Sequence, residues 1–356
     1  YSNELLHRTQ SDTCPGIYRH VPLSHLFSYS SRLRYYKYIA MCLNWYFIYQ
    51  KLGSMLFPQQ LLVNGGNGMV EFKGRVVLIT GAARGLGFSY ARCIGQLGAT
   101  VLIQDIGADS DGNGVDSQVA ELAAEKLRLE GLNVQAISGE IGSREGCHKL
   151  YRDALRIGGR LDALIHNAGW VAHESIESID ESSFDHMMAI SAKAPLWLAQ
   201  AAWPSMKAAG YGRIVMTTSC RALYPQYVQN GLASYAAAKM AVVGLTNVLA
   251  SEGERDGIIV NAVSPVAKTR MWGIEGEPDE LRPSEVAPGV AYLASAECTE
   301  GGWILRAANG QFHATRAMEA KGVDYPRNLR AVQASTAHEI AENWSLIAIP
   351  DLEPRS

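Results

Sequence analysis

The sequence lacks several features that would each point to a particular class of protein. It has six cysteines but no C-x-x-C pair, which argues against a structural zinc site. Because the cysteines show no paired spacing in so long a chain, we expect free thiols and a cytoplasmic location. The stretch 109–114 begins like a calcium loop, but Ala120 stands where such a loop needs Glu. A net charge of −3 lacks the basic surplus of a nucleic-acid-binding protein. We therefore expect a protein that binds neither a metal nor nucleic acid.

Long hydrophobic runs are also scarce near the start of the chain. The first 35 residues are polar and mixed, which does not fit a signal peptide. The uncharged stretch 38–50 has 13 residues, whereas a membrane-spanning helix needs about 20. Its aromatic cluster Trp45–Phe47 lies between Lys37 and Lys51, which leaves an interfacial helix open. We expect no membrane partner, with that helix as the alternative.

Residues 1–68 differ from the rest of the chain in composition. They hold 12 of the 30 aromatic residues and carry a charge of +4, which leaves −7 for residues 69–356. Residue 1 is Tyr rather than Met, and Met69 is the first Met directly before a regular pattern. We expect residues 1–68 to be an upstream extension that is disordered or non-native, with a membrane-surface or partner-binding arm as the alternative. Residues 69–356 are expected to form a single domain with a C-terminal extension from about 309.

From residue 75 onward, short apolar runs alternate with stretches of helical spacing. The runs predicted as strands are 75–80, 101–105, 134–137, 161–165, 213–217, 258–263 and 303–305. The stretches predicted as helices end near 97 or span 115–129, 144–157, 181–206, 232–254, 283–295 and 337–347. Continuous apolar runs are typical of strands that are buried on both faces. This alternation predicts an α/β fold with a doubly wound parallel sheet, the Rossmann fold, whose ligand site lies at the carboxyl ends of the strands.

A glycine-rich turn joins the first predicted strand to the first helix. Gly81 permits a tight turn, Gly85 lets the backbone approach a pyrophosphate, and Gly87 lets the helix pack on the strand. Asp105 ends the next strand, 18 residues after Gly87, near the spacing of an acid that binds the adenosine ribose. Such an acid repels a 2′-phosphate and favours NAD, although Arg84 could reach that phosphate in NADP. A glycine turn without any ligand is the structural alternative.

Two side chains with catalytic potential lie one helical turn apart. Tyr235 and Lys239 share a face at the start of a predicted helix. A phenol with a pKa near 10 is a weak base at neutral pH, and a nearby ammonium lowers that pKa. The pair could therefore exchange a proton with an alcohol or ketone. Ser219, just past a predicted strand, could donate a hydrogen bond to the substrate oxygen, or could simply be a turn residue.

Taken together, these motifs resemble those of the short-chain dehydrogenase/reductase family over about residues 72–308. The matching segments are Thr80–Gly87, Asn167–Gly169, Tyr235–Lys239 and Asn261–Pro265, in the order and spacing of the family. The resemblance implies that Tyr235 is the catalytic acid/base, that Lys239 lowers its pKa and binds ribose, and that Ser219 orients the substrate carbonyl. It further implies a nicotinamide cofactor. The residues that the resemblance assigns to this cofactor are Gly81, Arg84, Gly85, Leu86, Gly87, Asp105, Glu140, Ile141, Asn167, Ala168, Gly169, Tyr235, Lys239, Pro265 and Thr269.

Within that family, the chain looks like the (3R)-hydroxyacyl-CoA dehydrogenase domains of multifunctional enzyme type 2 and their bacterial relatives. Asp105–Asp109 is similar to their segment after the second strand, and Pro265–Met271 to their segment after the sixth. This resemblance implies the oxidation of a hydroxyacyl-CoA or a similar bulky apolar alcohol with NAD; a steroid is the alternative substrate. It also implies a homo-dimer or homo-tetramer that assembles through the helices at 181–206 and 232–254.

Three positions depart from the family pattern. Ser191 stands where the long helix usually carries the Asn of a proton relay, and a serine can still hold a water. Ser219 and Tyr235 are 16 residues apart, which indicates a three-residue insertion in 221–232, at the mouth of the substrate site. His166 replaces another Asn, and we interpret it as a partly buried residue at a strand end. These departures leave open a dinucleotide-binding regulatory protein with weakened catalysis.

Overall fold

The computed structural model describes residues 69–274, 278–319 and 321–348, and the expectations for residues 1–68 lie outside this part. Within it, eight strands form one sheet in the order β3-β2-β1-β4-β5-β6-β7-β8. The strands are β1 (Val76–Thr80), β2 (Thr100–Gln104), β3 (Val134–Ile137), β4 (Ala163–His166), β5 (Gly212–Thr217), β6 (Ile258–Val266), β7 (Ile304–Ala308) and β8 (Gln311–Thr315). The helices are α2 (Gly85–Gln96), α3 (Gln118–Leu129), α4 (Arg144–Gly158), α5 (Glu181–Met188), α6 (Ala194–Ala209), α7 (Cys220–Leu223), α8 (Ala233–Gly253), α9 (Ala287–Ala294), α10 (Ala337–Glu342) and α11 (Trp344–Ile347).

The pairing of the strands confirms the predicted fold class. Strands β1 to β7 are parallel, and only β8 runs antiparallel to its neighbour within this part of the chain. The chain passes from β1 to β2 and β3 on one side and then continues with β4 on the other side. A sheet of this kind opens a crevice at the carboxyl ends of the strands where its order reverses, here β1 and β4.

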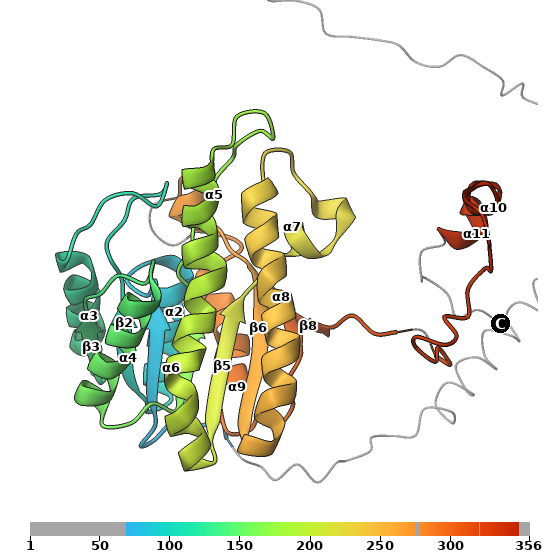
Figure 1. The fold of residues 1–356 in the computed structure, drawn as a ribbon. Coiled ribbons are helices and arrows are strands. Elements are labelled where there is room, and N and C mark those ends of the chain that lie inside the picture. The colour runs from blue at the N-terminus through green and yellow to red at the C-terminus, as the bar shows by residue number, and fades with distance from the viewer. Residues whose placement is uncertain (1–68, 275–277, 320, 349–356) are drawn as a thin grey trace, which may run out of the picture. The chain divides into compact units, whose positions relative to one another are not determined.

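Two apolar cores cover the faces of the sheet. Val77 and Ile79 of β1 belong to the core formed with α2, α3 and α9. Val76 and Leu78 belong to the opposite core, formed with α4, α6 and α8. Figure 1 shows α6 and α8 lying over β5 and β6, with α9 behind them. Because successive residues of β1 face opposite cores, every position of the strand must be apolar, which explains the uninterrupted run at 76–79.

Several elements differ from the expectations drawn from the sequence. The helix expected at 283–295 is a 3₁₀ turn at Pro283–Glu285 followed by α9, and α7 was not expected. The sequence does not predict β8, because its residues are mostly exposed and form no apolar run. The long helix expected at 181–206 extends to Ala209 and contains a π-helical turn at Ala189–Lys193. The helix expected from residue 115 begins at Gln118, because residues 106–116 fold back on themselves as a loop: the N–H of Asp116 donates to the carbonyl oxygen of Ile106 at 2.8 Å.

Two further expectations concern the cysteines and the last helix of the chain. Cys93, Cys147, Cys220 and Cys298 are free thiols, which confirms the prediction for the cysteines of the described part. A last helix was expected near 337–347, and the structure has α10 and α11 there.

The stretch Ala233–Asp256, which contains α8, is long and apolar enough to cross a membrane by length and composition, a test that core helices of soluble proteins also pass. It packs against β6 and α5.

Candidate active site

The turn after β1 adopts backbone conformations that favour glycine. Gly81 and Gly85 have φ values of +62° and +51°, in the left-handed region. A Cβ at Gly81 would lie 2.7 Å from Cα of Ala168, and one at Gly87 would lie 2.2 Å from the carbonyl oxygen of Gly81. The turn is therefore in close contact with α2 and with the segment after β4. No side chain caps the N-terminus of α2, so its first N–H groups are free to bind an anion.

Asp105 follows β2 and faces this turn. One of its carboxylate oxygens accepts a hydrogen bond from the N–H of Ala83 at 3.1 Å, and the other accepts one from the N–H of Gly107 at 2.8 Å. Each carboxylate oxygen has a second lone pair, so the side chain can still accept hydrogen bonds from a ligand. Asp105 thus lies where an acid that binds ribose is expected.

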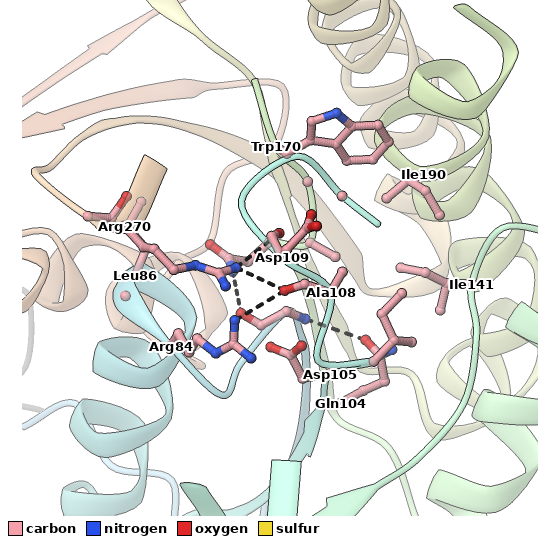
Figure 2. A pocket seen from close by; sticks show the side chains of 18 of the residues that line it. Arg84, Leu86, Gln104, Asp105, Ala108, Asp109, Ile141, Trp170, Ile190 and Arg270 are labelled. Atoms are coloured by element: carbon pink, nitrogen blue, oxygen red, sulfur yellow. Dashed lines mark hydrogen bonds between the residues drawn. The ribbon is translucent and has the colours of Figure 1, made fainter. Parts of the chain in front are cut away.

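Two arginines hold the loop that follows Asp105. Figure 2 shows the guanidinium groups of Arg84 and Arg270 converging on Ala108. Arg84 donates to the carbonyl oxygen of Ala108 at 3.1 Å, and Arg270 donates to the same oxygen at 3.0 Å and to that of Asp109 at 3.1 Å. The ring of Trp170 packs on Gly112, where an added Cβ would lie 2.8 Å from the indole. The loop is thereby fixed beside the glycine turn.

A chain of hydrogen bonds connects the ends of β1 and β4. The hydroxyl oxygen of Thr80 accepts hydrogen bonds from the N–H groups of Asn167 at 3.1 Å and Ala168 at 3.2 Å. Both of its lone pairs are thus engaged, so its proton points toward Nδ1 of His166 at 3.0 Å. Nε2 of His166 then donates to the carbonyl oxygen of Ile190 at 3.0 Å. This arrangement requires a neutral imidazole with its proton on Nε2.

The environment of His166 keeps the ring neutral. Burial, and then the positive charge of Lys239, lower the pKa of His166 to about 3. The side chain is fully buried, so the interpretation as a partly buried residue is wrong. Its role is to order the segment that begins with Asn167, whose amide nitrogen Nδ2 also donates to the carbonyl oxygen of Gly81 at 2.9 Å.

A cavity of about 170 Å³ lies between these elements. The residues predicted to bind the cofactor that line it are Gly81, Arg84, Gly85, Leu86, Asp105, Ile141, Asn167, Ala168, Gly169 and Thr269. Gly87 is not among the lining residues; its lack of a Cβ allows α2 to pack closely against the turn. Glu140 is exposed and is not among the lining residues; its carboxylate accepts a hydrogen bond from the Ser143 hydroxyl at 3.0 Å.

The residues present fit a dinucleotide. Thr269 lines both this first cavity and a second one of about 890 Å³. Its hydroxyl oxygen Oγ1 is buried and has no hydrogen-bond partner. Buried polar atoms are rarely left unpaired in folded proteins. An unpaired hydroxyl where two cavities meet therefore fits an elongated ligand that reaches from one cavity into the other.

Three of the four predicted catalytic side chains, Ser219, Tyr235 and Lys239, meet in the second cavity, which Pro265 also lines. Lys239 is 3% exposed, and its Nζ donates to the carbonyl oxygen of Thr217 at 3.1 Å. The same Nζ lies 5.7 Å from the centre of the Tyr235 ring. Residues from the end of β5 and from the first turns of α8 thus come together, as the i, i+4 spacing of Tyr235 and Lys239 predicts.

The electrostatics of this cluster differ from the expectation. Burial raises the pKa of the Tyr235 phenol, while a hydrogen bond with Ser219 and the positive charge of Arg221 act in the opposite direction. The effect of Lys239 on the pKa of Tyr235, expected from the sequence, stays a prediction. Burial lowers the pKa of the Lys239 ammonium to about 8.

Ser191 lies in the π-helical turn, buried and outside the lining of both cavities. Its hydroxyl makes a weak hydrogen bond to the Met187 sulfur at 3.5 Å. A Cβ at Gly169 would lie 3.5 Å from Oγ of Ser191 and also 3.5 Å from Nζ of Lys239. Both polar groups therefore lie beside Gly169, an arrangement compatible with the predicted proton relay, which stays a prediction.

The segment 221–232, where the insertion is expected, forms most of α7 and a 3₁₀ turn at Pro225–Tyr227. Arg221 and the residues 226–229 line the second cavity. The cavity is also bounded by Trp170 and Trp272. This segment therefore forms part of the wall around Ser219 and Tyr235.

Gln104, Arg306 and Arg270 are among the residues of the two cavities that escaped the reasoning from sequence. Gln104 donates from Nε2 to the carbonyl oxygen of Gly139 at 2.7 Å, and its position in an apolar strand was an available signal. Arg306 lies in β7 and lines the second cavity, and a charged residue next to an apolar run was likewise visible in the sequence. Arg270 gave no such signal, because its partners are backbone carbonyl oxygens 161 and 162 residues away.

Comparisons with known proteins agree with this geometry. The family model described as short chain dehydrogenase matches residues 75–278. Peroxisomal multifunctional enzyme type 2 of Mus musculus is 34% identical over 282 residues, which cover 78% of this chain but only 37% of that protein. The hydroxyacyl-CoA dehydrogenase ChsB1 of Mycobacterium tuberculosis is 31% identical over 65% of this chain and 75% of its own length. A solved short chain dehydrogenase from Mycobacterium avium is 27% identical, with a TM-score of 0.66, and the match covers 80% of this chain and 98% of that one.

Proposed function

The chain belongs to the short chain dehydrogenase family, and from that premise we propose that it interconverts a secondary alcohol and a ketone with NAD as the cofactor. Membership of the family makes the protein an oxidoreductase that uses a nicotinamide dinucleotide. The observation that carries the proposal is the meeting of Ser219, Tyr235 and Lys239 in one cavity. Through Thr269, this cavity adjoins the one beside the glycine turn.

The chemistry divides between the cofactor and the chain. The bound nicotinamide supplies the site to which the hydride of the alcohol carbon is transferred. Ser219 donates a hydrogen bond to the substrate oxygen, and Tyr235 takes the hydroxyl proton in oxidation and returns it in reduction. Lys239 contributes a buried positive charge beside Tyr235 and donors for a ribose hydroxyl. Thr269 offers its unpaired hydroxyl to the nicotinamide end of the cofactor.

The preference for NAD rests on Asp105. Its carboxylate is held at the end of β2 by two backbone N–H groups. A negative charge there accepts hydrogen bonds from ribose hydroxyls and repels a 2′-phosphate. Arg84 and Arg270 lie nearby, but both guanidinium groups already donate to backbone carbonyl oxygens of the loop. This engagement supports NAD rather than NADP.

The substrate we propose is a bulky alcohol such as a 3-hydroxyacyl thioester, and a steroid is the alternative. Support comes from the relative named hydroxyacyl-CoA dehydrogenase and from a cavity of about 890 Å³, which is large enough for either class. The chain spans 37% of the mouse multifunctional enzyme, so the other activities of that protein are not transferred to it.

A screen of cofactors and alcohols tests the proposal. The full chain is mixed with NAD or NADP and a panel of 3-hydroxyacyl thioesters, steroids and simple secondary alcohols, and the absorbance of the reduced nicotinamide is followed. We expect turnover of at least one bulky alcohol, with a higher kcat/KM for NAD. Tight binding of NAD without turnover of any alcohol would instead favour the regulatory protein with weakened catalysis.

We also propose a homo-dimer or homo-tetramer that assembles through α5, α6 and α8. Support comes from Met240 and Val248 of α8, which are 47% and 56% exposed. Apolar side chains exposed on one helix favour burial against a partner. The mass of the protein in solution, measured by light scattering, gives the number of subunits. The cytoplasmic location stays a prediction, which microscopy of the tagged full chain can check.

A further inference from the structure

The second cavity carries positive charge that the proposed reaction does not use. Among its described lining residues are Arg221, Lys239 and Arg306, but no Asp or Glu. Lys239 serves the reacting end of the cavity, whereas Arg221 and Arg306 belong to α7 and β7. A cavity lined by unpaired cations attracts anions and raises their local concentration.

Arg306 has no carboxylate partner in the described part of the chain. Its guanidinium lies 4.9 Å from the centre of the Tyr224 ring and 5.9 Å from that of Tyr227. Burial acts to lower the pKa of Arg306, but the hydrogen bonds with Cys220 and with Tyr227 act in the opposite direction, and the pKa is raised. Stacking on an aromatic face fixes the plane of a guanidinium. Its five N–H donors outnumber these two hydrogen bonds, so donors remain for a planar anion. The two rings thus orient Arg306 without neutralising it.

Arg221 stands on the same wall, two residues after Ser219. Its guanidinium donates to the side-chain oxygen Oε1 of Gln229, which is a neutral partner. Burial raises the pKa of Tyr235, and the positive charge of Arg221 reaches that phenol and acts in the opposite direction. Arg221 is therefore a second cation that no carboxylate of the described residues neutralises.

Arg306 also lies at the boundary with a further cavity of about 340 Å³. Cys220, Val266 and Arg306 line both cavities. The further cavity is otherwise formed by β6 and the β7–β8 hairpin. No Asp or Glu is among its lining residues, whose polar members besides Arg306 and Cys220 are Ser264, Asn309, Gln311 and His313. A substrate whose anionic group binds Arg306 could therefore extend into either of the two cavities.

We propose that the substrate carries an anionic oxygen group, a carboxylate or a phosphate, and that Arg306 binds this group with the help of Arg221. The proposal rests on the proposed function, because it assigns the reacting alcohol to Ser219 and Tyr235 in the same cavity. Arg306 is then a specificity-determining residue. A charged hydrogen bond contributes about 1.5–3 kcal/mol, which corresponds to roughly 10- to 150-fold in kcat/KM.

The test compares pairs of alcohols in which one member carries the anionic group and the other is a neutral analogue with the same reacting alcohol. One pair is a medium-chain 3-hydroxyacyl-CoA and its neutral N-acetylcysteamine thioester, and the other is a medium-chain hydroxy acid and its methyl ester. The variants are Arg306→Gln, Arg306→Lys and the control Arg316→Gln. Arg316 also stacks on an aromatic ring, that of Trp303 at 4.2 Å, but lines neither of the two cavities at Arg306.

We expect Arg306→Gln to lower kcat/KM for the charged member of one pair at least tenfold, mainly through KM. The neutral member should change less than twofold, Arg306→Lys should recover part of the loss, and Arg316→Gln should resemble the wild type. The affected pair identifies the anion as phosphate or carboxylate. An equal loss for both members, or no loss for either, would overturn the proposal.

The anion site can be tested separately if the proposed function fails. If the wild type turns over no alcohol of either pair, binding of the hydroxy acid and of the CoA ester is measured by calorimetry in the presence of NAD. Binding that Arg306→Gln weakens at least tenfold and Arg316→Gln does not would still support the anion site. Absent binding, or binding that Arg306→Gln leaves unchanged, would overturn the anion site as well.

Discussion

At the scale of single residues, the hydroxyl of Thr80 holds together the ends of β1 and β4 at the candidate site. It accepts two backbone hydrogen bonds from the segment after β4 and donates one to His166, which joins that segment to β1. A threonine at the end of a strand is visible in the sequence. Its three simultaneous hydrogen bonds cannot be predicted from the sequence, because Asn167 and Ala168 are 87 and 88 residues away from it.

Protonation of His166 provides a prediction for stability. The pKa of His166 is about 3 in the folded protein and about 6.5 in an unfolded chain, so below pH 6.5 the unfolded state binds a proton that the folded state does not. Stability should therefore fall as the pH falls, by about 2 kcal/mol from this group between pH 7 and pH 5. His166→Asn keeps an acceptor for Thr80 but cannot titrate. Urea unfolding at both pH values should show a pH dependence smaller by that amount in the variant; an identical dependence would contradict the assignment.

The charge of Asp105 provides a prediction for cofactor choice. Asp105→Asn keeps a side-chain acceptor but removes the negative charge beside the proposed ribose site. We expect the ratio of kcat/KM for NADP to that for NAD to rise about tenfold or more, because a like-charge repulsion of roughly 1–2 kcal/mol is lost. Steady-state kinetics with both cofactors measure this ratio. Asp111→Asn, in the same loop but outside the lining of the cavity, is the control, and an unchanged ratio in Asp105→Asn would refute the role of its charge.

At the scale of elements, two irregular segments shape the site. The π-helical turn at 189–193 contains both the carbonyl oxygen that accepts from His166 and the side chain of Ser191. Such turns interrupt the regular bonding of a helix and are frequent at functional sites. The loop 106–116 is the second segment, and its position depends on Arg84, Arg270 and Trp170. Helical periodicity predicts neither feature, because each depends on partners far along the chain.

The loop gives a prediction at this scale. Arg270→Ala removes two hydrogen bonds to the carbonyl oxygens of Ala108 and Asp109, which should loosen the loop beside the cofactor cavity. We expect KM for NAD to rise about three- to tenfold, in keeping with roughly 1 kcal/mol for partly exposed hydrogen bonds, with little change in kcat. Hydrogen exchange of residues 106–114 should become faster. Arg92→Ala, an arginine paired with Glu130, is the control, and slow exchange with an unchanged KM would show that Arg270 does not hold the loop.

At the scale of the whole molecule, the sheet and the place of the candidate site followed from the sequence. Apolar runs such as 76–79 identified the seven parallel strands, and the glycine turn together with Asp105 indicated the edge where the site lies. The antiparallel β8 was missed because exposed edge strands need no apolar run. Arg306 was missed as a site residue because its closeness to Tyr224 and Tyr227 depends on how β7 and the segment after α7 pack.

The central claim is that Tyr235 exchanges the proton while the cavity beside the glycine turn binds NAD. The most direct test is Tyr235→Phe in the full chain, assayed with the best alcohol from the screen and with NAD binding measured by calorimetry. Since general acid/base groups contribute about 100- to 10,000-fold, we expect kcat to fall at least 100-fold while the dissociation constant of NAD changes less than threefold. Turnover within tenfold of the wild type would contradict the role of Tyr235.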